Sequence, residues 1–494
     1  MKILALETSA KSVSCAVVED GAPLASAYQC TGLTHSRTLL PMVDAMLKNA
    51  DLTIETIDAI ANLFEKKGSN AWFEMEAEDM LPEGFTCPHC GKATGFEKES
   101  DTLDGWFDSG STHYAAMERD QGFWPATMYI EGLDQYRGWF QSSLLVAVGA
   151  LGRGAPFKEC LTHGWTVDGQ GRAMHKSLGN GMDPAEIFNK YGADLLRLWA
   201  GSSDYHVDVR CSDDIFKQLS QNYLKFRNTA KFCLDNLTGF DPEQLVAAAD
   251  MQELDRWAVT RLNSLIRRVF DSYDAYEFHA VSHAINDFCV VDLSSFYFDI
   301  IKDRLYCDGE NSLSRRSAQT ALFLILDAMT RMFAPILAFT CEEIWLAMPH
   351  RSADDSRSVL FNCMVQPYED YALPEDAMDR WARIAAVRSA VNGALEQARA
   401  DKTIGKSLEA EVDVTVPAED AFLADLNADT LADLLIVSQV RVTVGDALSV
   451  TVAPAQGVKC ARCWKVLTSV GTVAGHDTLC PRCAAVVKAL PVVE

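Results

Sequence analysis

The sequence predicts a multidomain protein that is α/β in its first part, α-helical in its middle and closed by a zinc ribbon. A chain of 494 residues is longer than one hydrophobic core supports. Up to about residue 205, β-type segments alternate with glycine-containing loops and helices, whereas apolar residues recur at helical spacing from there to about residue 400. Two Cys-x-x-Cys pairs lie close to the C-terminus.

The composition is that of a soluble globular protein, with 48% hydrophobic and 23% charged residues. No run of about 18 apolar residues occurs, so we expect no membrane span, and the first residues are too weakly apolar for a signal peptide. Fifteen cysteines, an odd number, fit cytoplasmic thiols and metal ligands better than disulfides. The net charge of −25 argues against a general polyanion binder, although a local basic patch can still meet nucleic acid.

Residues 1–61 form a separate segment. We predict strands at Ile3–Leu6, Val13–Val18 and Pro23–Gln29 and a helix at Ser36–Asn49. The wording LETSAKSVSCAVVEDG and THSRTLLPMVDAML resembles the start of the bacterial scaffold subunit of the threonylcarbamoyl-adenosine tRNA-modification complex, which implies an actin/Hsp70-like fold. The resemblance covers only the opening of that family, so we expect a truncated segment with no activity to assign.

The next segment carries helix patterns and the pair Cys87 and Cys90. A Cys-x-x-Cys knuckle supplies half of a tetrahedral zinc site. Its second pair is not nearby in the sequence, because Cys160 and Cys211 stand alone. The pair either takes distant ligands or is an incomplete half-site, and we predict the incomplete half-site.

A predicted strand at Thr127–Ile130 leads directly into Glu131, Gly132, Asp134 and Gln135, which precede a helix that ends near Gly149. Carboxylates at the carboxyl end of a strand lie where open α/β sheets bind ligands. They suit ribose hydroxyls or an ammonium group. The same pattern also fits a cluster that caps and packs the helix.

Phe157–Val167 supplies the next predicted strand, and residues 164–180 then form a loop hinged on glycines, in which Lys176 lies beside Ser177. Glycines let backbone amides approach an anion closely, and the ammonium group can stabilise negative charge that develops on it. Taken alone, the loop is also typical of a solvated turn with an ordinary surface lysine.

Four segments in order change this interpretation: DTLDGWFDSG, YIEGLDQYRGWFQSSLL, LTHGWTVDGQGRAMHKSLGN and YGADLLRLWAGSSDYHVDVR. Together they resemble the C-terminal half of the catalytic domain of bacterial isoleucyl-tRNA synthetases, which are class I enzymes, and residues 62–494 all fit that family. The resemblance implies a partial Rossmann-type core over 62–205. It also implies that Glu131 contacts the isoleucyl-adenylate and that Gly132, Asp134 and Gln135 line its site.

By the same resemblance, Lys176 is the second lysine of the family's Lys-Met-Ser-Lys-Ser loop and acts on ATP, with Ser177 beside it. The sequence departs from that pattern twice, because Ala173 stands where the first lysine usually is and His175 stands where the first serine is. One cation fewer is expected to weaken stabilisation of pyrophosphate, unless Arg172 or His175 substitutes. Histidine charges only near neutral pH or below, so it is a weak replacement.

Residues 206–400 predict a helical bundle. The expected helices are Ile215–Leu237, Leu254–Tyr273, Phe278–Tyr306, Ser317–Met348 and Asp379–Ala400, with Pro335 kinking or dividing the fourth. The resemblance implies that this bundle is the anticodon-binding domain. Aromatic residues in such helices are more often core residues than platforms for bases.

Residues 401–455 predict a small α/β connector, with strands at Ala410–Val416 and Val440–Val444 and a helix at Ala421–Leu435. Residues 456–494 predict a zinc ribbon, because Cys460, Cys463, Cys480 and Cys483 form two knuckles separated by 16 residues. Free surface thiols are the alternative. Lys459, Arg462, Lys465 and Arg482 make the knuckles locally basic, and ribbons of this kind often touch nucleic acid; the resemblance implies a contact that supports tRNA binding.

The expected function is therefore that of an isoleucine–tRNA ligase, with tRNA(Ile), ATP with Mg²⁺ and isoleucine as partners, one structural zinc, a monomeric state and a cytoplasmic location. The family's His-Ile-Gly-His signature, first Rossmann strand and editing domain do not occur in these 494 residues, so we expect a truncated chain with adenylation lost or impaired. A non-catalytic tRNA-binding fragment is the alternative, and a tRNA-modification scaffold fragment is a weaker one.

Overall fold

The computed structural model describes residues 2–7, 13–19, 22–29, 45–46, 63, 66–68, 70–81, 84–87, 90–98, 104–119 and 121–490. It divides into two compact units, Met1–Thr166 with Tyr205–Val209, and Val167–Asp204 with Arg210–Glu494. Each unit is described by itself below. In the described part of the chain, no helix combines the length and the apolar character that crossing a membrane requires.

The first unit opens with an antiparallel sheet of β1 (Lys2–Glu7), β2 (Val13–Glu19) and β3 (Ala22–Gln29), in the order β1-β2-β3. The three predicted strands are thereby confirmed, each longer by one to two residues. The predicted helix at Ser36–Asn49 lies outside the described residues apart from positions 45 and 46. The actin/Hsp70-like assignment stays a prediction.

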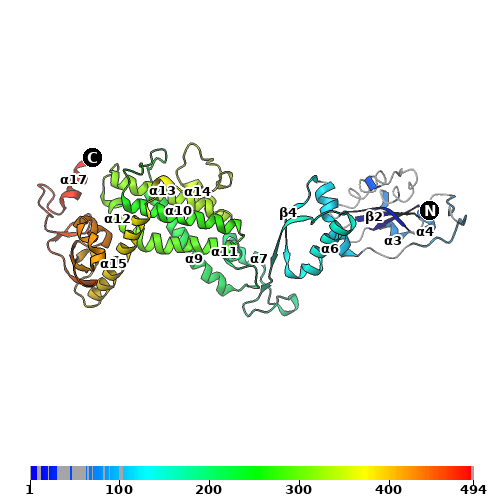
Figure 1. The fold of residues 1–494 in the computed structure, drawn as a ribbon, viewed down its shortest axis with the longest axis horizontal. Helices are drawn as coiled ribbons and strands as arrows, with labels where there is room; N and C mark the ends of the chain where they lie inside the picture. The colour runs from blue at the N-terminus through cyan, green and yellow to red at the C-terminus, as the bar shows by residue number, and fades with distance from the viewer. Residues whose placement is uncertain are drawn as a thin grey trace. The chain divides into compact units, whose positions relative to one another are not determined.

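The rest of the first unit is built around a β-α-β unit (Figure 1). Its elements are α3 (Ala71–Glu74), α4 (Ala77–Met80), α5 (Gly105–Gly110), the π-helical turn η2 (His113–Arg119), β4 (Ala126–Gly132), the 3₁₀ turn η3 (Leu133–Arg137), α6 (Trp139–Leu145), the π-helical turn η4 (Val146–Ala150) and β5 (Phe157–His163). β4 and β5 pair in parallel, with Glu131 opposite Thr162 and Gly132 opposite His163. Parallel strands need a crossover, which α6 provides.

A small core fixes this β-α-β unit. Tyr129 of β4 stacks on Trp139 of α6 with ring centroids 4.2 Å apart and also meets Phe157 of β5 at 4.8 Å. Phe140 and Ala126 are buried in the same cluster. The predicted strand at Thr127–Ile130 is confirmed, whereas the single strand predicted for Phe157–Val167 is wrong at its end, because β5 stops at His163 and β6 (Thr166–Val167) is separate.

The second unit begins at Val167, the last residue of β6, and includes the 3₁₀ turn η5 (Lys176–Leu178), α7 (Pro184–Tyr191) and α8 (Ala193–Ser202); the boundary between the units divides β7 (Val209–Arg210). α7 starts where it does because the Asp183 side chain accepts a hydrogen bond from Ala185 N and Pro184 occupies the first helical position. Ile187 and Phe216 are buried in a small cluster with Cys211.

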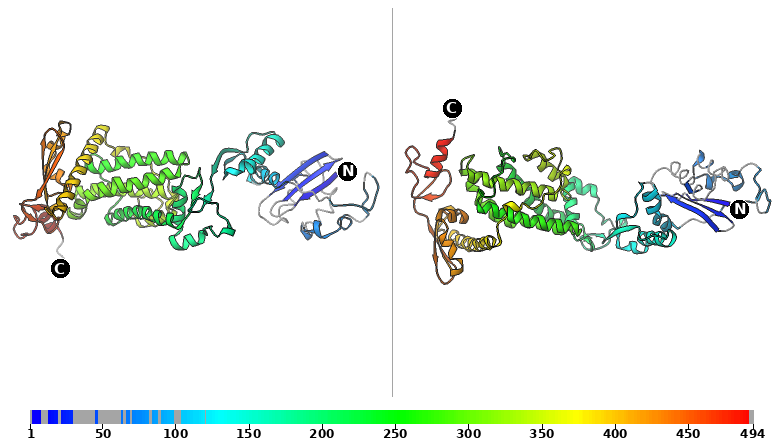
Figure 2. Two further views of the ribbon diagram at one scale, coloured as in Figure 1. Left: turned by 90° about the horizontal axis from the view of Figure 1, so that it is seen from below. Right: turned by 45° about the horizontal axis from the view of Figure 1, so that its top comes forward.

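The helical region is a bundle of long helices that run alongside one another in both views of Figure 2. It consists of α9 (Asp213–Asn236), α10 (Glu253–Asp274), α11 (Phe278–Asp287), the π-helical segment η6 (Phe288–Tyr297), α12 (Phe298–Cys307), α13 (Leu313–Phe333), α14 (Ala338–Ala347) and α15 (Glu375–Ala400), with 3₁₀ turns η7 (Val359–Phe361) and η8 (Glu369–Tyr371). The predicted helices are confirmed to within about four residues at each end. The fourth is divided between Phe333 and Ala338, next to Pro335 as predicted, since proline cannot continue the hydrogen-bond ladder.

One hydrophobic core runs through this region. Trp257, Phe333 and Trp345 are all buried, as expected for aromatic residues that belong to the core. α13 is buried on every side from Ser317 to Phe333, which explains its nearly continuous apolar sequence.

A buried carboxylate ties three helices of the bundle together. Asp255 of α10 is fully buried and accepts hydrogen bonds from Tyr297 Oη at 2.8 Å, Ser317 Oγ at 2.5 Å and Arg304 Nη2 at 2.6 Å. A buried charge without partners is strongly destabilising, so the carboxylate and the Arg304 guanidinium of α12 must remain together. Helix α12 is therefore fixed to the interior of the bundle.

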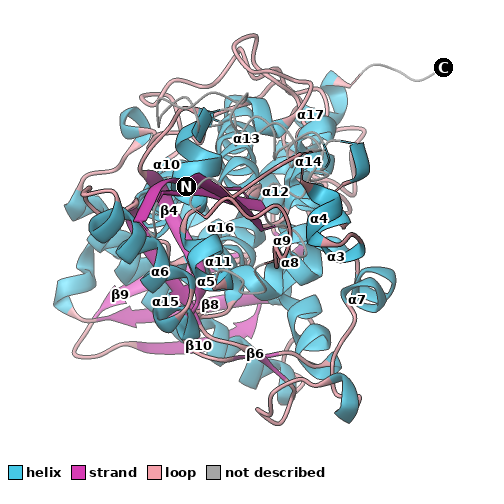
Figure 3. Ribbon diagram, turned by 90° about the vertical axis from the view of Figure 1, so that its right-hand side faces the viewer, coloured by secondary structure: helices cyan, strands magenta, loops and turns pink. Residues whose placement is uncertain are grey.

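The connector is a three-stranded sheet packed against α15 (Figure 3). Its elements are the 3₁₀ turn η9 (Ser407–Glu409), β8 (Ala410–Val416), the 3₁₀ turn η10 (Ala418–Asp425), α16 (Ala428–Leu435), β9 (Gln439–Val444) and β10 (Ser449–Pro454). The strand order is β10-β8-β9, with β8 parallel to β9 and antiparallel to β10.

The connector departs from the sequence prediction in two ways. The helix predicted at Ala421–Leu435 is wrong in its first half, because Asn427 accepts hydrogen bonds from Asp429 N and Thr430 N and starts α16 at Ala428. β10 is a third strand that was not predicted. The last elements of the chain are β11 (Val458–Lys459), β12 (Val466–Leu467) and α17 (Pro481–Ala489), which form the ribbon.

Candidate adenylate-site segments and zinc centre

In the first unit, two of the four family-like segments pack directly on one another. α5 carries Trp-Phe-Asp-Ser-Gly, and its Ser109 carbonyl accepts a hydrogen bond from Trp139 Nε1 of α6 at 3.0 Å. A Cβ atom on Gly110 would lie 2.7 Å from the Ser142 backbone carbon, so only glycine permits this approach of α5 to α6. The segments that the sequence places 30 residues apart are thus neighbours.

The predicted adenylate residues lie at the carboxyl end of β4, as expected. Glu131 is the exposed penultimate residue of the strand, and its carboxylate accepts a hydrogen bond from Gly132 N at 2.8 Å. Gln135 donates to Asp134 Oδ2 at 3.1 Å and accepts from Trp139 N at 3.0 Å, which caps α6. The capping alternative is therefore real for Gln135, while Glu131 and Asp134 remain exposed to solvent.

The third and fourth segments also meet in the first unit. Gly164 N donates to Tyr205 O and Trp165 N donates to Asp208 Oδ1, both at 2.8 Å. A Cβ atom on Gly164 would lie 2.4 Å from the Val207 carbonyl carbon, so this glycine is required by close backbone contact.

In the second unit, a single carboxylate organises what we call the Asp168 loop, residues 167–180. Asp168 is largely buried and accepts hydrogen bonds from Gln170 N, Arg172 N and Arg172 Nε, each at 2.9 Å, and from Asn180 Nδ2 at 3.0 Å. These bonds, first that of Asn180 and then that of Arg172 N, hold the pKa of the carboxyl well below its usual range.

Asn180 closes the same loop from its other end. Its Nδ2 also donates to Ala173 O at 3.0 Å, and its Oδ1 accepts from His175 N at 2.9 Å. Met174 packs against the small cluster around Ile187. The loop is therefore held at both ends by internal hydrogen bonds, while its residues 169–173 stay exposed; the assignment of Lys176 to ATP rather than to an ordinary surface position stays a prediction.

The order in this loop leaves two of the candidate nucleotide residues exposed. His175 and Ser177 are exposed, and Lys176 begins the 3₁₀ turn η5, with Leu178 N bonded to His175 O at 3.0 Å. The two organisers, Asp168 and Asn180, were missed by the sequence analysis. The turn pattern Asp-Gly-x-Gly at 168–171 was the available signal for the first of them.

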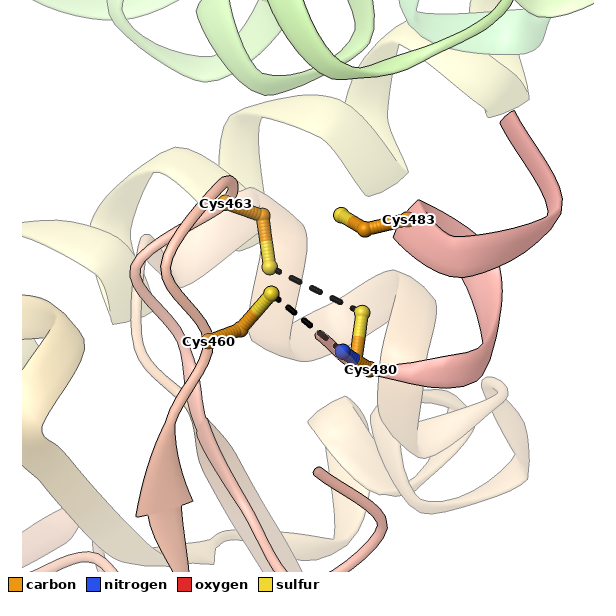
Figure 4. A group of neighbouring side chains, drawn as sticks. All are labelled: Cys460, Cys463, Cys480 and Cys483. Carbon is orange, nitrogen blue, oxygen red and sulfur yellow. Dashed lines mark hydrogen bonds between the residues drawn. The ribbon is translucent and has the colours of Figure 1, made fainter. Parts of the chain in front are cut away.

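The four C-terminal cysteines come together as the sequence predicts. Cys460, Cys463, Cys480 and Cys483 are buried, and their Sγ atoms lie within 4.8 Å of one another (Figure 4). The Sγ atoms of Cys463 and Cys480 are 3.9 Å apart. Tetrahedral zinc with Zn–S bonds of about 2.3 Å requires an S–S separation of about 3.8 Å. The residues therefore fit one structural zinc ion.

The electrostatics of this group also call for a cation. Against the effect of burial, backbone N–H groups of Cys463, Cys480 and Arg462 lower the pKa of the Cys460 thiol to about 6. Burial and the neighbouring Cys480 raise the pKa of the Cys463 thiol to about 11. Four thiolates cannot coexist in this space without positive charge, which a bound zinc ion supplies.

The pair Cys87 and Cys90 differs from this group. Cys90 is exposed, and Cys87 N donates to Lys92 O at 2.7 Å. In the described ranges, the four C-terminal cysteines form the one cluster with at least three potential metal ligands. Cys87 and Cys90 do not belong to it. That the pair is an incomplete half-site stays a prediction.

The basic residues of the ribbon do not form the free basic patch that their sequence suggested. Arg482 pairs with Asp303, and Lys465 pairs with Asp433. Arg462 donates to backbone carbonyls of α12. Trp464, which follows the first knuckle, is by contrast 57% exposed, and Lys406 Nζ lies 5.7 Å from its ring centroid.

Three family matches follow the chain in order. Residues 42–212 match the family described as tRNA synthetases class I (I, L, M and V), residues 255–414 match the anticodon-binding domain of tRNA ligase, and residues 457–486 match the zinc finger found in FPG and IleRS. The first match begins before residue 62, where the sequence analysis places its boundary; that boundary stays a prediction.

The similar curated proteins are isoleucine–tRNA ligases. Those of Caldanaerobacter subterraneus subsp. tengcongensis and Syntrophotalea carbinolica are 46% and 47% identical over 445 residues, which is 87% of this chain and 47% of each relative. That of Geobacter sulfurreducens is 46% identical over 449 residues. The chain thus spans about half the length of the curated relatives it matches.

Among solved structures, the ternary complex of Agrobacterium radiobacter K84 LeuRS with tRNA and LeuAMS aligns with a TM-score of 0.45 and 16% identity, covering 75% of this chain and 38% of that one. The zinc-finger match and the four-cysteine geometry agree on one structural zinc site. The ordered family matches and the identity to the curated ligases show that the chain carries class I tRNA synthetase domains and is homologous to isoleucine–tRNA ligases over about half of their length.

Proposed function

We propose that this chain serves the isoleucine–tRNA ligase reaction, in which isoleucine is activated with ATP and transferred to tRNA(Ile). The observation that carries the proposal is the ordered set of synthetase, anticodon-binding and zinc-finger matches, supported by 46% identity to a curated ligase over 87% of the chain. We further propose that the protein acts as a monomer in the cytoplasm.

In the first step, the carboxylate of isoleucine attacks the α-phosphorus of ATP, and the bond to pyrophosphate breaks. We assign Glu131 to the isoleucyl-adenylate and Gly132, Asp134 and Gln135 to its surroundings. Their place at the carboxyl end of β4 is where parallel sheets bind ligands. Mg²⁺ accompanies ATP and neutralises charge on its phosphates.

We assign Lys176 to the developing phosphate charge, with His175 and Ser177 beside it. The Asp168 loop supports this assignment, because its hydrogen bonds are internal and leave His175 and Ser177 exposed for a ligand. An ammonium group held near a transferring phosphoryl group lowers the barrier without a large reorganisation.

In the second step, a hydroxyl of the terminal adenosine of tRNA attacks the acyl carbon, and AMP leaves. The helical region and the ribbon would hold the tRNA. Trp464 supports a role of the ribbon in this contact, since an exposed aromatic ring beside the cation Lys406 is suited to stacking on a base.

Isoleucine-dependent exchange of pyrophosphate into ATP tests the activation step. We expect Lys176→Ala to lower the exchange rate by about a hundredfold, as for other groups that stabilise charge in a transition state. Lys231→Ala is the matched control, because this lysine pairs with Asp235 on the exposed side of α9. Exchange that does not depend on isoleucine, or that survives the loss of Lys176, would refute the assignment.

A second candidate is tRNA binding without catalysis. The observation that favours it is the single hydrophobic core from Leu195 to Val440, which unites the helical region and the connector independently of the first unit. Binding of isoleucine tRNA measured by gel shift, in the absence of any pyrophosphate exchange, would select this candidate. Exchange together with binding would select the ligase.

A further inference from the structure

The two zinc knuckles share a feature beyond their cysteines. Each carries an arginine immediately before its second cysteine, Arg462 in Cys-Ala-Arg-Cys and Arg482 in Cys-Pro-Arg-Cys. These arginines come from knuckles that lie about twenty residues apart in the chain, yet both reach the C-terminal end of the same helix, α12 (Phe298–Cys307).

Arg462 caps this helix end. Its guanidinium donates to Tyr306 O at 3.2 Å and to Cys307 O, and the Cys307 thiol donates to Arg462 O at 3.7 Å. The last carbonyls of a helix have no partner within the helix and carry the negative end of its dipole. A guanidinium in this position satisfies them and is attracted by the dipole.

Arg482 holds the same helix through a side chain. It donates to Asp303 at 2.5 Å and 2.8 Å in a two-pronged pair, and it lies 3.7 Å from Asp308. Asp303 is partly buried, and the pKa of its carboxyl is nevertheless lowered, because the Arg482 guanidinium outweighs the effect of burial. The next residue of α12, Arg304, is fixed to the buried Asp255. The helix therefore joins the ribbon to the interior of the bundle.

Arg462 is also joined to the cysteines themselves. It belongs to the first knuckle, and its guanidinium lies 3.9 Å from Cys483 Sγ of the second. One residue of the first knuckle thus reaches a sulfur of the second knuckle and two carbonyls of α12. Its geometry depends on both knuckles being closed, and its charge offsets part of the negative charge of four thiolates around one zinc ion.

The remaining attachment of the ribbon does not involve the knuckle arginines. Val466 N donates to Ser438 Oγ at 2.7 Å, and Gln439 Nε2 donates to Gln456 O at 2.7 Å. Lys465 pairs with Asp433 of α16. These contacts fasten the base of the ribbon to the connector, and Cys307 of α12 is buried in one cluster with the four cysteines.

We propose that Arg462 and Arg482 lock the zinc ribbon onto α12, so that zinc controls where the ribbon sits on the anticodon-binding region as well as how it folds. Zinc binding and docking of the ribbon on α12 are coupled, so each raises the equilibrium constant of the other by the same factor. Zinc closes the knuckles and aims the arginines at α12, and docking on α12 retains the zinc. This proposal does not depend on whether the chain activates isoleucine.

The rate at which the zinc-loaded full chain releases its metal to a chromogenic chelator tests the coupling. We expect Arg482→Ala and Asp303→Asn each to accelerate release by about ten- to a hundredfold, the range for losing a hydrogen-bonded charge pair. The double variant should release zinc no faster than the quicker single variant, because both changes remove one interaction. Arg441→Ala is the matched control, since this arginine pairs with Glu411 and Asp413 on the connector.

Asp303→Asn keeps the test decisive if a change inside the ribbon prevents its folding, because residue 303 lies on α12 and outside the knuckles. A second readout is hydrogen exchange of the amides of α12 in the full chain, before and after zinc removal. After zinc removal, we expect the amides at the C-terminal turn of α12 to exchange faster and the amides in the middle of α10 to exchange at an unchanged rate. Unchanged release rates for both single variants, or unchanged exchange in α12, would overturn the proposal.

Discussion

The Asp168 loop and the zinc ribbon are both short, glycine-containing and basic, and neither has an apolar core large enough to order it. They differ in what replaces that core. The loop is ordered by hydrogen bonds that converge on one carboxylate, whereas the ribbon is ordered by four sulfurs around a cation site. Both segments pair their arginines within the protein: Arg172 of the loop binds Asp168 of the same loop, whereas Arg462 and Arg482 of the ribbon bind α12. The loop leaves His175 and Ser177 exposed.

The largest effect should follow from removing one sulfur. Cys483→Ser is expected to abolish the bound zinc and the order of the ribbon, because metal binding supplies most of the folding free energy of such a small domain. Zinc content and hydrogen exchange of residues 457–489 would measure this. Cys363→Ser, at an exposed cysteine, is the control. A ribbon that stays protected without zinc would mean that its few apolar contacts suffice.

The second effect concerns the hub of the loop. Asp168→Ala leaves four donors without this acceptor, so we expect amides of residues 170–175 to exchange at least about tenfold faster. Asp168→Asn should be intermediate, since its oxygen still accepts. Glu186→Gln, one helix away, should leave the exchange unchanged; equal effects of Glu186→Gln and Asp168→Ala would show that the carboxylate has no special role.

Acidification should disrupt the zinc ribbon and the Asp168 loop at different pH values. The pKa of Asp168 is lowered on folding, so its contribution to the loop is complete above the usual value of 3.8 and is lost only as the pH falls through the lower folded value. The thiolates of the ribbon must take up protons to release zinc, which happens at higher pH. A pH titration of zinc content and of loop exchange should therefore show the ribbon failing first. Loss of both at the same pH would contradict this order.

The smallest effect should come from Arg172→Ala. The Arg172 side chain is mostly exposed, and Asp168 keeps its bonds from Asn180 Nδ2 and two backbone amides. An exposed pair of this kind contributes little, so loop exchange should change by less than about threefold. Arg482→Ala, which removes a less exposed arginine that donates twice to its carboxylate, should have the larger effect on its own segment. The reverse ranking would mean that exposure does not decide the value of these pairs.

The sequence was sufficient for features that local pattern determines. Helical periodicity located α9, α10 and α15, alternation located β8 and β9, and cysteine spacing located the zinc site. It missed β10, an edge strand whose alternation is confined to Val450 and Val452 and ends at Pro454. It also read through Asn427, whose capping bonds interrupt the helical periodicity.

What remained hidden depends on residues that are distant in the chain. The role of Asn180 appears only when the loop folds back on Asp168. The partners of Arg462 and Arg482 lie more than 150 residues away on α12, so local basic charge was interpreted as a nucleic-acid patch. A basic residue in a sequence does not by itself show whether its partner in the folded protein is a carboxylate of the same chain or a phosphate of a ligand.

The continuous core from α8 to β9 has a consequence for how such a chain can be divided. The sequence changes character near residue 400, but Leu395 of α15 and Val412 of β8 are both fully buried in one cluster. A cut at that position would expose both faces to water. The helical region and the connector therefore form one folding unit. Recombination between relatives should tolerate junctions before α8 far better than junctions after α15.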